Sequence, residues 1–132
     1  MSFPRPVESS VSEPYWSGLK RGHLLFQRCQ KCGEAWLPAR ECCPRCLSPE
    51  VEWVESAGRG KIVSWIIYHT AYDDAFKDRV PYDVTLVELD EGPRVLTNVV
   101  DNPVGRSLTI GGRVRLQVEM EGDLALARFA LE

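Results

Sequence analysis

The segment CQKCGEAWLPARECCPRC, residues 29–46, contains all five cysteines of this 132-residue chain. Cys29 and Cys32 form one CxxC pair, and Cys43 and Cys46 form a second pair after a spacer of ten residues. Each pair can form a knuckle that points two thiolates the same way, so the two pairs supply the four ligands of a tetrahedral metal site. Four thiolates leave no position for a substrate. The spacing therefore predicts a structural Zn²⁺ site in a rubredoxin-like ribbon, with iron as an open alternative because it takes the same ligands.

The remaining cysteine, Cys42, directly precedes Cys43 and is out of phase with the second knuckle. We interpret it as a spare thiol, and the alternatives are a competing metal ligand or a reactive cysteine. For the cluster as a whole, the alternative is a set of buried or redox-active cysteines. A disulfide framework is disfavoured by the odd count. Leu47 follows the second pair at a position where glycine, as at Gly33, would suit the turn better.

The composition is typical of a soluble globular protein, with 44% hydrophobic residues, 27% charged residues and a net charge of −3. The longest apolar runs, such as IVSWII at 62–67, are far shorter than the ~20 residues of a membrane helix. The first sixteen residues contain no apolar signal segment. We therefore expect a cytoplasmic protein that has no membrane association.

Five segments after residue 51 have the composition of strands, and the later ones alternate polar and apolar residues. These segments are 60–70, 82–89, 94–100, 113–120 and 124–131. Turn residues separate them, and a longer link, DNPVGRSLTIGG, follows the third. This order predicts a mainly β chain that ends in a five-stranded OB-fold barrel, since an immunoglobulin-like sandwich needs about seven strands.

Three regions are expected along the chain: a flexible tail at 1–12, a helix and zinc ribbon at 13–50, and the OB-fold domain at 51–132. Within EPYWSGLKRGHLLFQ (13–27), apolar residues recur at roughly helical spacing, which predicts a short helix that runs into a strand before Cys29. Trp16 and Trp36 are expected to pack this helix on the ribbon. A platform for a partner is the alternative.

Four stretches carry a resemblance that spans about residues 13 to 120. They are PYWSGLKRGHLLFQRCQKCGEAWLPARECCPRC (14–46), VEWVESAGRGKIVSW (51–65), PYDVTLVELDEGPRVLTNVV (81–100) and IGGRVRLQVE (110–119). In this order they resemble the DUF35 family of zinc-ribbon and OB-fold, acyl-CoA-associated proteins. The chain departs from the family pattern at Cys42, at Leu47 and in LPAR, which has one proline where the family tends to have two.

The resemblance implies a partner rather than a reaction. Members are typically small, non-catalytic accessory subunits of thiolase-fold enzymes such as thiolases, acyltransferases and side-chain aldolases. We therefore expect a hetero-oligomer in which this chain supports the stability of the enzyme and its binding of an acyl-CoA thioester. A free-standing acyl-CoA-binding protein is the alternative. We expect no catalytic activity in the chain alone. Its two histidines, His23 and His69, do not stand beside a recognisable nucleophile motif.

Nucleic-acid binding is a further alternative, because other OB-folds bind oligonucleotides. Residues 51–132 contain nine basic and fourteen acidic side chains. An acidic barrel repels a phosphate backbone, whose neutralisation supplies most of the affinity in such complexes. We therefore expect no nucleic-acid partner.

Two groups of residues are candidates for contacts with CoA phosphates or with the partner. The ribbon has a positive balance from Arg28, Lys31, Arg40 and Arg45. This charge either offsets that of a zinc tetrathiolate or, at Arg28, Lys31 and Arg40, contacts the phosphates. Tyr72 and Phe76 stand among charged residues in the link TAYDDAFKDRVP (70–81). They suit an interface, or they cap the open end of the barrel.

Overall fold

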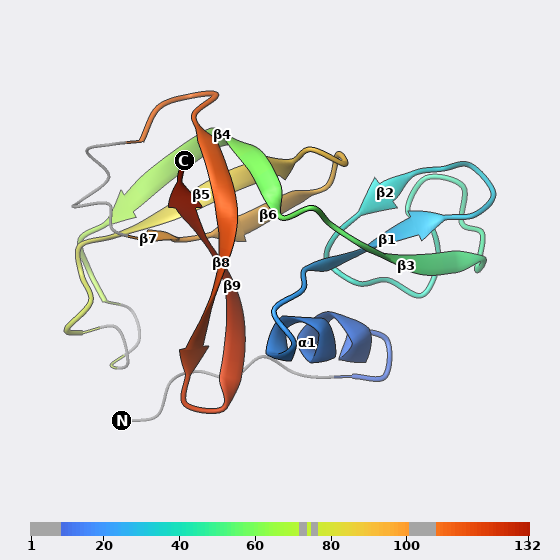
Figure 1. The fold of residues 1–132 in the computed structure, drawn as a ribbon, viewed down its shortest axis with the longest axis horizontal. Coiled ribbons are helices and arrows are strands. Elements are labelled where there is room, and N and C mark those ends of the chain that lie inside the picture. Colours follow the sequence, from blue (N-terminus) through green and yellow to red (C-terminus); the bar gives the residue numbers. More distant parts are fainter. Residues whose placement is uncertain (1–8, 72–73, 75–76, 101–107) are drawn as a thin grey trace.

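The computed structural model describes residues 9–71, 74, 77–100 and 108–132. In this part of the chain, one helix and nine strands form two sheets that lie side by side (Figure 1). The prediction of a mainly β chain with one short helix, a ribbon and a barrel is confirmed. No described helix has the length and apolar character needed to cross a lipid bilayer.

The helix α1 (Glu13–Lys20) covers the first half of the segment in which a helix was predicted. Pro14 in the first turn suits a helix start, and acidic Glu13 and basic Lys20 stand at the ends that favour their charges. The helix ends before Gly22, and the chain then enters β1 (Leu25–Cys29).

The smaller sheet is the ribbon, with the strand order β2-β1-β3. Strand β2 (Ala35–Trp36) and strand β3 (Val51–Glu55) both pair antiparallel with β1. Residues 51–55 were expected to begin the barrel, but they pair with β1 and not with the barrel strands. The two ends of the cysteine segment are thereby held in one sheet.

The larger sheet has the order β6-β5-β4-β8-β9-β7 and closes into the barrel. Its strands are β4 (Arg59–Tyr68), β5 (Tyr82–Leu89), β6 (Arg94–Thr97), β7 (Val99–Val100), β8 (Arg113–Glu121) and β9 (Leu124–Leu131). The third predicted strand, 94–100, is interrupted at Asn98. Its first part pairs with β5, and its second part pairs parallel with β9. This pairing joins the two edges of the sheet, as in an OB-fold.

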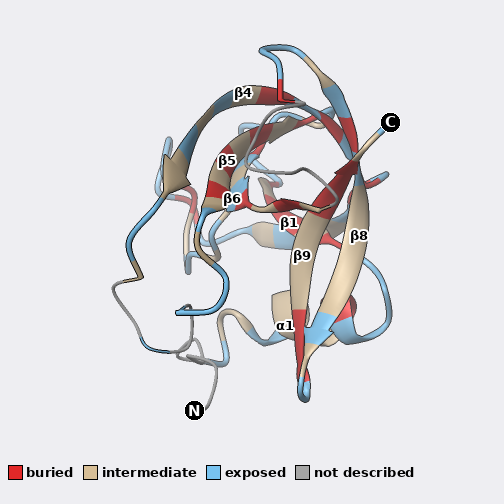
Figure 2. Cartoon of the chain, turned by 90° about the vertical axis from the view of Figure 1, so that its left-hand side faces the viewer, coloured by how far each residue is buried: buried red, intermediate tan, exposed pale blue. Residues whose placement is uncertain are grey.

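The barrel core includes residues from the N-terminal segment. Leu19 of α1 and Leu24 pack in one buried cluster with barrel residues such as Ile62, Val87 and Phe129. The helix contacts β9 and lies beside the β8–β9 hairpin (Figures 1 and 2). The helix therefore closes part of the barrel and at the same time leads the chain into the ribbon.

Candidate metal centre

Four cysteines come together where β1 ends and β3 begins. The sulfur atoms of Cys29, Cys32, Cys43 and Cys46 all lie within 4.8 Å of one another. The Cys29 and Cys46 sulfurs are 3.6 Å apart, and the Cys32 and Cys43 sulfurs are also 3.6 Å apart. Sulfurs bound at about 2.3 Å to a tetrahedral zinc ion are ~3.8 Å from one another. The cluster is therefore positioned to hold a metal ion without rearrangement.

Backbone amides of each knuckle point at a cysteine sulfur. The amides of Lys31 and Cys32 both donate to Cys29 Sγ at 3.4 Å, and two amides of the second knuckle donate to Cys43 Sγ at 3.3 and 3.4 Å. The Cys32 amide, helped by the Lys31 amide and opposed by burial, lowers the pKa of Cys29 to about 6. Hydrogen bonds to sulfur favour the thiolate, which is the form that binds metal.

A buried amide side chain supports the cluster from one side. Gln27 is only 3% exposed, and its Oε1 accepts hydrogen bonds from Trp36 Nε1 and from the Arg40 backbone N–H, each at 2.7 Å. Its Nε2 donates to the Arg40 carbonyl at 3.1 Å. Trp36 in turn packs against Cys29 and Cys43. These bonds tie the loop between the two CxxC pairs to the ribbon sheet.

The sequence analysis did not identify Gln27, although a signal was present. In a strand, residues two apart face the same side, so Gln27 shares a side with Leu25 and with the predicted ligand Cys29. A polar residue on the inward side of a small ribbon needs hydrogen-bond partners. Its partners come from residues nine and thirteen positions away, which periodicity does not reveal.

The predicted basic residues lie on three different segments of the ribbon. The guanidinium of Arg28 lies 5.3 Å from the centre of the Phe26 ring, Lys31 is exposed in the first knuckle, and Arg40 is exposed with its backbone held by Gln27. Within the described ranges, none of the three makes an ion pair.

Cys42 is half-buried and is not a member of the four-sulfur cluster. Tyr72 and Phe76 lie outside the described residues. Trp36 packs within the ribbon, as expected, whereas Trp16 packs against the barrel core cluster. The helix is therefore held by the barrel to a greater degree than the sequence suggested.

Chemically, the cluster is suited to structure rather than to catalysis. All four ligand positions of a tetrahedral ion are taken by protein sulfurs, so a bound ion has no open position for a substrate. His23 is not a member of the cluster and pairs with a carboxylate. His23 Nδ1 lies 3.1 Å from Glu55 Oε1, and both side chains are at least half exposed.

Comparisons with known proteins agree with both parts of the fold. Residues 16–52 match the family model described as the ChsH2 rubredoxin-like zinc ribbon domain. Residues 53–119 match the model described as the ChsH2 C-terminal OB-fold domain.

Relatives of known name are similar over most of the chain. A DUF35 domain-containing scaffold protein of Methanothermobacter thermautotrophicus is 36% identical over 108 residues, which are 79% of this chain and 80% of the relative. A probable enoyl-CoA hydratase alpha subunit of Thermomonospora curvata is 39% identical over 97 residues, or 74% of this chain. The matched region spans only 30% of that longer relative.

A solved structure is similar over nearly the full length. The match is to the Ltp2-ChsH2(DUF35) aldolase, with a TM-score of 0.84 and 34% sequence identity. It covers 96% of this chain and 98% of the matched chain.

Proposed function

We propose that this chain, which belongs to the DUF35 family of zinc-ribbon and OB-fold proteins, is a non-catalytic accessory subunit that binds a thiolase-fold enzyme. In this proposal it stabilises that enzyme and supports its binding of an acyl-CoA thioester. The observation that carries the proposal is the similarity, over 98% of the matched chain, to the solved Ltp2-ChsH2(DUF35) aldolase. The name of that structure joins a DUF35 chain to Ltp2 in an aldolase.

Zinc is the metal we propose for the four-cysteine cluster. The donor set is all thiolate, the sulfur separations suit a tetrahedron, and the matching ribbon model is a zinc ribbon. Ligation of this kind stabilises small peptides by ~10–16 kcal/mol. Such a contribution matters in a ribbon whose buried cluster is small: Cys29, Trp36 and Cys43, with the partly buried Val51 packed against them.

Contacts with the CoA phosphates or with the partner are proposed for Arg28, Lys31 and Arg40. Support comes from their position on the ribbon and from the absence of a salt bridge to a carboxylate within the described part of the chain. Tyr72 and Phe76 are proposed as partner contacts on the basis of the sequence alone.

The proposal is tested by purifying the tagged protein from its native host at moderate salt. We expect a thiolase-fold protein to co-elute at near-equal stoichiometry, and metal analysis of the same fraction to give one zinc per chain. A protein that elutes alone, with zinc bound, would contradict the accessory role and favour a free acyl-CoA-binding protein. Iron in place of zinc would correct the metal and leave the accessory role intact.

Charge reversal tests the phosphate contact. In the assembled complex, Arg40→Glu is expected to weaken CoA-ester binding by about fivefold or more at low salt, and by less at high salt, because the contact is exposed. Arg115→Glu is the matched control, since Arg115 is an exposed arginine on the barrel. Equal affinity for Arg40→Glu and the unmodified complex would exclude this role for Arg40.

A further inference from the structure

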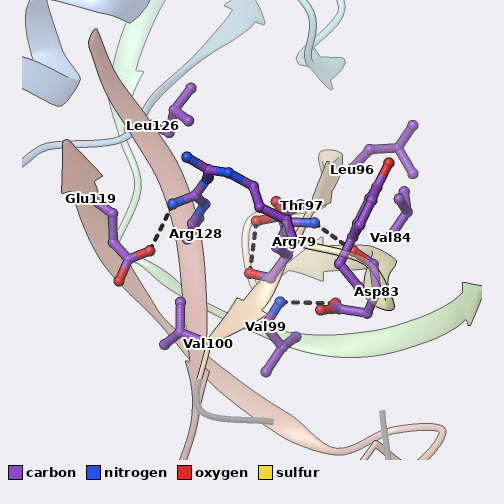
Figure 3. Close-up of a pocket in the computed structure, with 12 residues that line it drawn as sticks. Arg79, Asp83, Val84, Leu96, Thr97, Val99, Val100, Glu119, Leu126 and Arg128 are labelled. Carbon is purple, nitrogen blue, oxygen red and sulfur yellow. Dashed lines mark hydrogen bonds and ion pairs between the residues drawn. The ribbon is translucent and has the colours of Figure 1, made fainter. Parts of the chain in front are cut away.

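A hollow of about 550 Å³ lies on the barrel where its sheet closes (Figure 3). Its apolar walls include Val84, Leu96, Val100 and Leu126, and two arginines, Arg79 and Arg128, also line it. We call this hollow the seam pocket. Nothing in the site described above uses it, because no ribbon residue lines it.

Side-chain hydrogen bonds fix the backbone at the floor of the seam pocket, where β6 ends and β7 begins. The buried carboxylate of Asp83 accepts hydrogen bonds from the Val99 amide at 2.9 Å and from Thr85 Oγ1 at 2.5 Å. Asn98 Nδ2 donates to the Asp83 carbonyl, and the Phe129 amide donates to the Asn98 carbonyl at 3.1 Å. The hollow is therefore a preorganised part of the barrel.

Arg128 is the most informative residue of the pocket. Its side chain is only 13% exposed, and it donates to Glu119 Oε1 at 2.9 Å and to Glu121 Oε1 at 3.1 Å. A guanidinium has five N–H donors, and no third hydrogen bond from Arg128 to a described residue is found. The remaining N–H groups of this largely covered side chain are therefore free to donate to a molecule that replaces water in the pocket.

The charges around Arg128 restrict what that acceptor can be. Arg128 forms salt bridges with Glu119 and Glu121, and Arg79 forms a bidentate salt bridge with Glu121, with N–O distances of 2.6 and 2.9 Å. With the Asp83 carboxylate nearby, the site has no net positive charge. A phosphate or carboxylate would meet these acidic groups, whereas an uncharged carbonyl oxygen accepts a hydrogen bond without that repulsion.

We propose that the seam pocket binds an uncharged, mainly apolar molecule, with its apolar body against Val84, Leu96 and Leu126 and a carbonyl oxygen that accepts hydrogen bonds from Arg128. The identity of the ligand rests on the proposed function. The acyl end of an acyl-CoA thioester has both an apolar chain and an uncharged carbonyl oxygen. The phosphates of the CoA stay outside the pocket. The size of the pocket falls in the range of known small-molecule sites.

The test uses the zinc-loaded chain of 132 residues and an uncharged probe, the S-hexanoyl thioester of N-acetylcysteamine. In an NMR titration, the probe is expected to shift the amide signals of residues 98–100 and 126–129. The S-hexyl thioether, which lacks the thioester carbonyl, is expected to bind about tenfold more weakly, the order of one hydrogen bond to a charged group. Hexanoate is expected to bind more weakly than the thioester.

Matched variants separate the pocket from general effects of surface apolarity. Leu96 at the rim is 73% exposed, and Met120, which does not line the pocket, is 56% exposed, so neither substitution disturbs the core. Leu96→Asp is expected to weaken thioester binding at least about fivefold, and Met120→Asp to leave it unchanged. Arg128→Lys, which keeps the charge and loses the planar fork, is expected to remove the preference for thioester over thioether.

Several outcomes would overturn the inference: no shift of the pocket amides, equal affinity for thioester and thioether, tighter binding of hexanoate, or an unchanged affinity in Leu96→Asp. Assembly with the thiolase-fold partner is measured on the same variants. An intact complex without thioester binding rejects the seam pocket and leaves the proposed function standing. Thioester binding by a chain that recruits no partner rejects the proposed function and supports the pocket.

Discussion

Two equivalent residues of the ribbon have the same backbone conformation but different side chains. Gly33 follows the first CxxC pair with φ +81°, and Leu47 follows the second pair with φ +64°. The Gly33 amide donates to the Cys29 carbonyl, and the Leu47 amide donates to the Cys43 carbonyl, both at 2.9 Å. This turn requires a left-handed conformation, which is unfavourable for leucine. Leu47 is also 72% exposed, so burial does little to offset the strain.

Leu47→Gly is therefore expected to stabilise the zinc-loaded protein by about 0.5–1 kcal/mol, because relief of strain exceeds the entropy that glycine adds to the unfolded chain. The free energy of unfolding, measured by denaturant titration, checks this expectation. Gly33→Ala is the reverse control and is expected to destabilise by about 1 kcal/mol, although a Cβ at position 33 meets no atom within 4 Å. A loss of stability in Leu47→Gly would show that the Leu47 side chain stabilises the fold despite its exposure, by more than the strain costs.

At the scale of elements, the β8–β9 hairpin is joined to the segment before β5 by charged side chains. Glu121, the last residue of β8, accepts hydrogen bonds from Arg79 at 2.6 and 2.9 Å and from Arg128 at 3.1 Å. The hydrogen bonds from Arg79, followed by that from Arg128, lower the pKa of Glu121 from its usual 4.5 to about 2, although burial opposes the shift. The carboxylate is thus held ionised across the neutral range.

A lowered pKa in the folded state means that Glu121 contributes stability above its unfolded pKa and loses it as the pH falls toward 2. We expect the melting temperature to decline between about pH 5 and pH 2, and the decline to be shallower in Glu121→Gln. Thermal melts across this pH range provide the measurement. Glu52→Gln, a change at an exposed glutamate of β3, is the control and should leave the slope unaltered. Identical slopes for Glu121→Gln and the unmodified protein would contradict the role of Glu121.

At the scale of the whole molecule, one carboxylate joins the ribbon to the barrel. Glu91 lies in the turn between β5 and β6, and it accepts hydrogen bonds from Ser56 Oγ at 2.9 Å and from the Ala57 amide at 2.7 Å. The Ser56 amide donates to the Leu24 carbonyl at 2.8 Å, and the Gly58 amide donates to Ser56 Oγ at 2.9 Å. The linker between β3 and β4 is thereby held to both parts.

Glu91→Ala is expected to leave both sheets folded and to loosen the ribbon relative to the barrel, because Ser56 and the Ala57 amide lose their shared acceptor. The cost in stability is about 1–3 kcal/mol, since the side chain of Ser56 is buried. Residual dipolar couplings of the two sheets measure the change as a difference between their alignment tensors. Glu88→Ala serves as the control, because Glu88 pairs with Lys61 and Arg94 and does not contact the linker. A common alignment tensor in Glu91→Ala would show that apolar packing of α1, Leu24 and Leu37 on the barrel fixes the ribbon without this carboxylate.

Much of the fold was predictable because its signals are local. The spacing of the two CxxC pairs indicated the four-sulfur cluster. Strand-like composition indicated β5, and period-two alternation indicated β9, each at the bounds that the structure has. The third barrel strand was predicted as one unit, but it is interrupted at Asn98, where it changes from pairing with β5 to pairing with β9. Alternation does not reveal such a change of partner, because it reports which side of a strand is buried and not what covers it.

By itself, the sequence determined the four-cysteine cluster, the positions of most barrel strands along the chain and the turns between them, because each depends on residues close together in the chain. The tertiary structure alone decided that β3 pairs with β1, that Leu19 and Leu24 enter the barrel core, and that Arg79 and Arg128 line one pocket. These arrangements join residues up to about a hundred positions apart. They arise because closing the sheet and burying its apolar side bring distant segments into contact, and no local pattern records which segments meet.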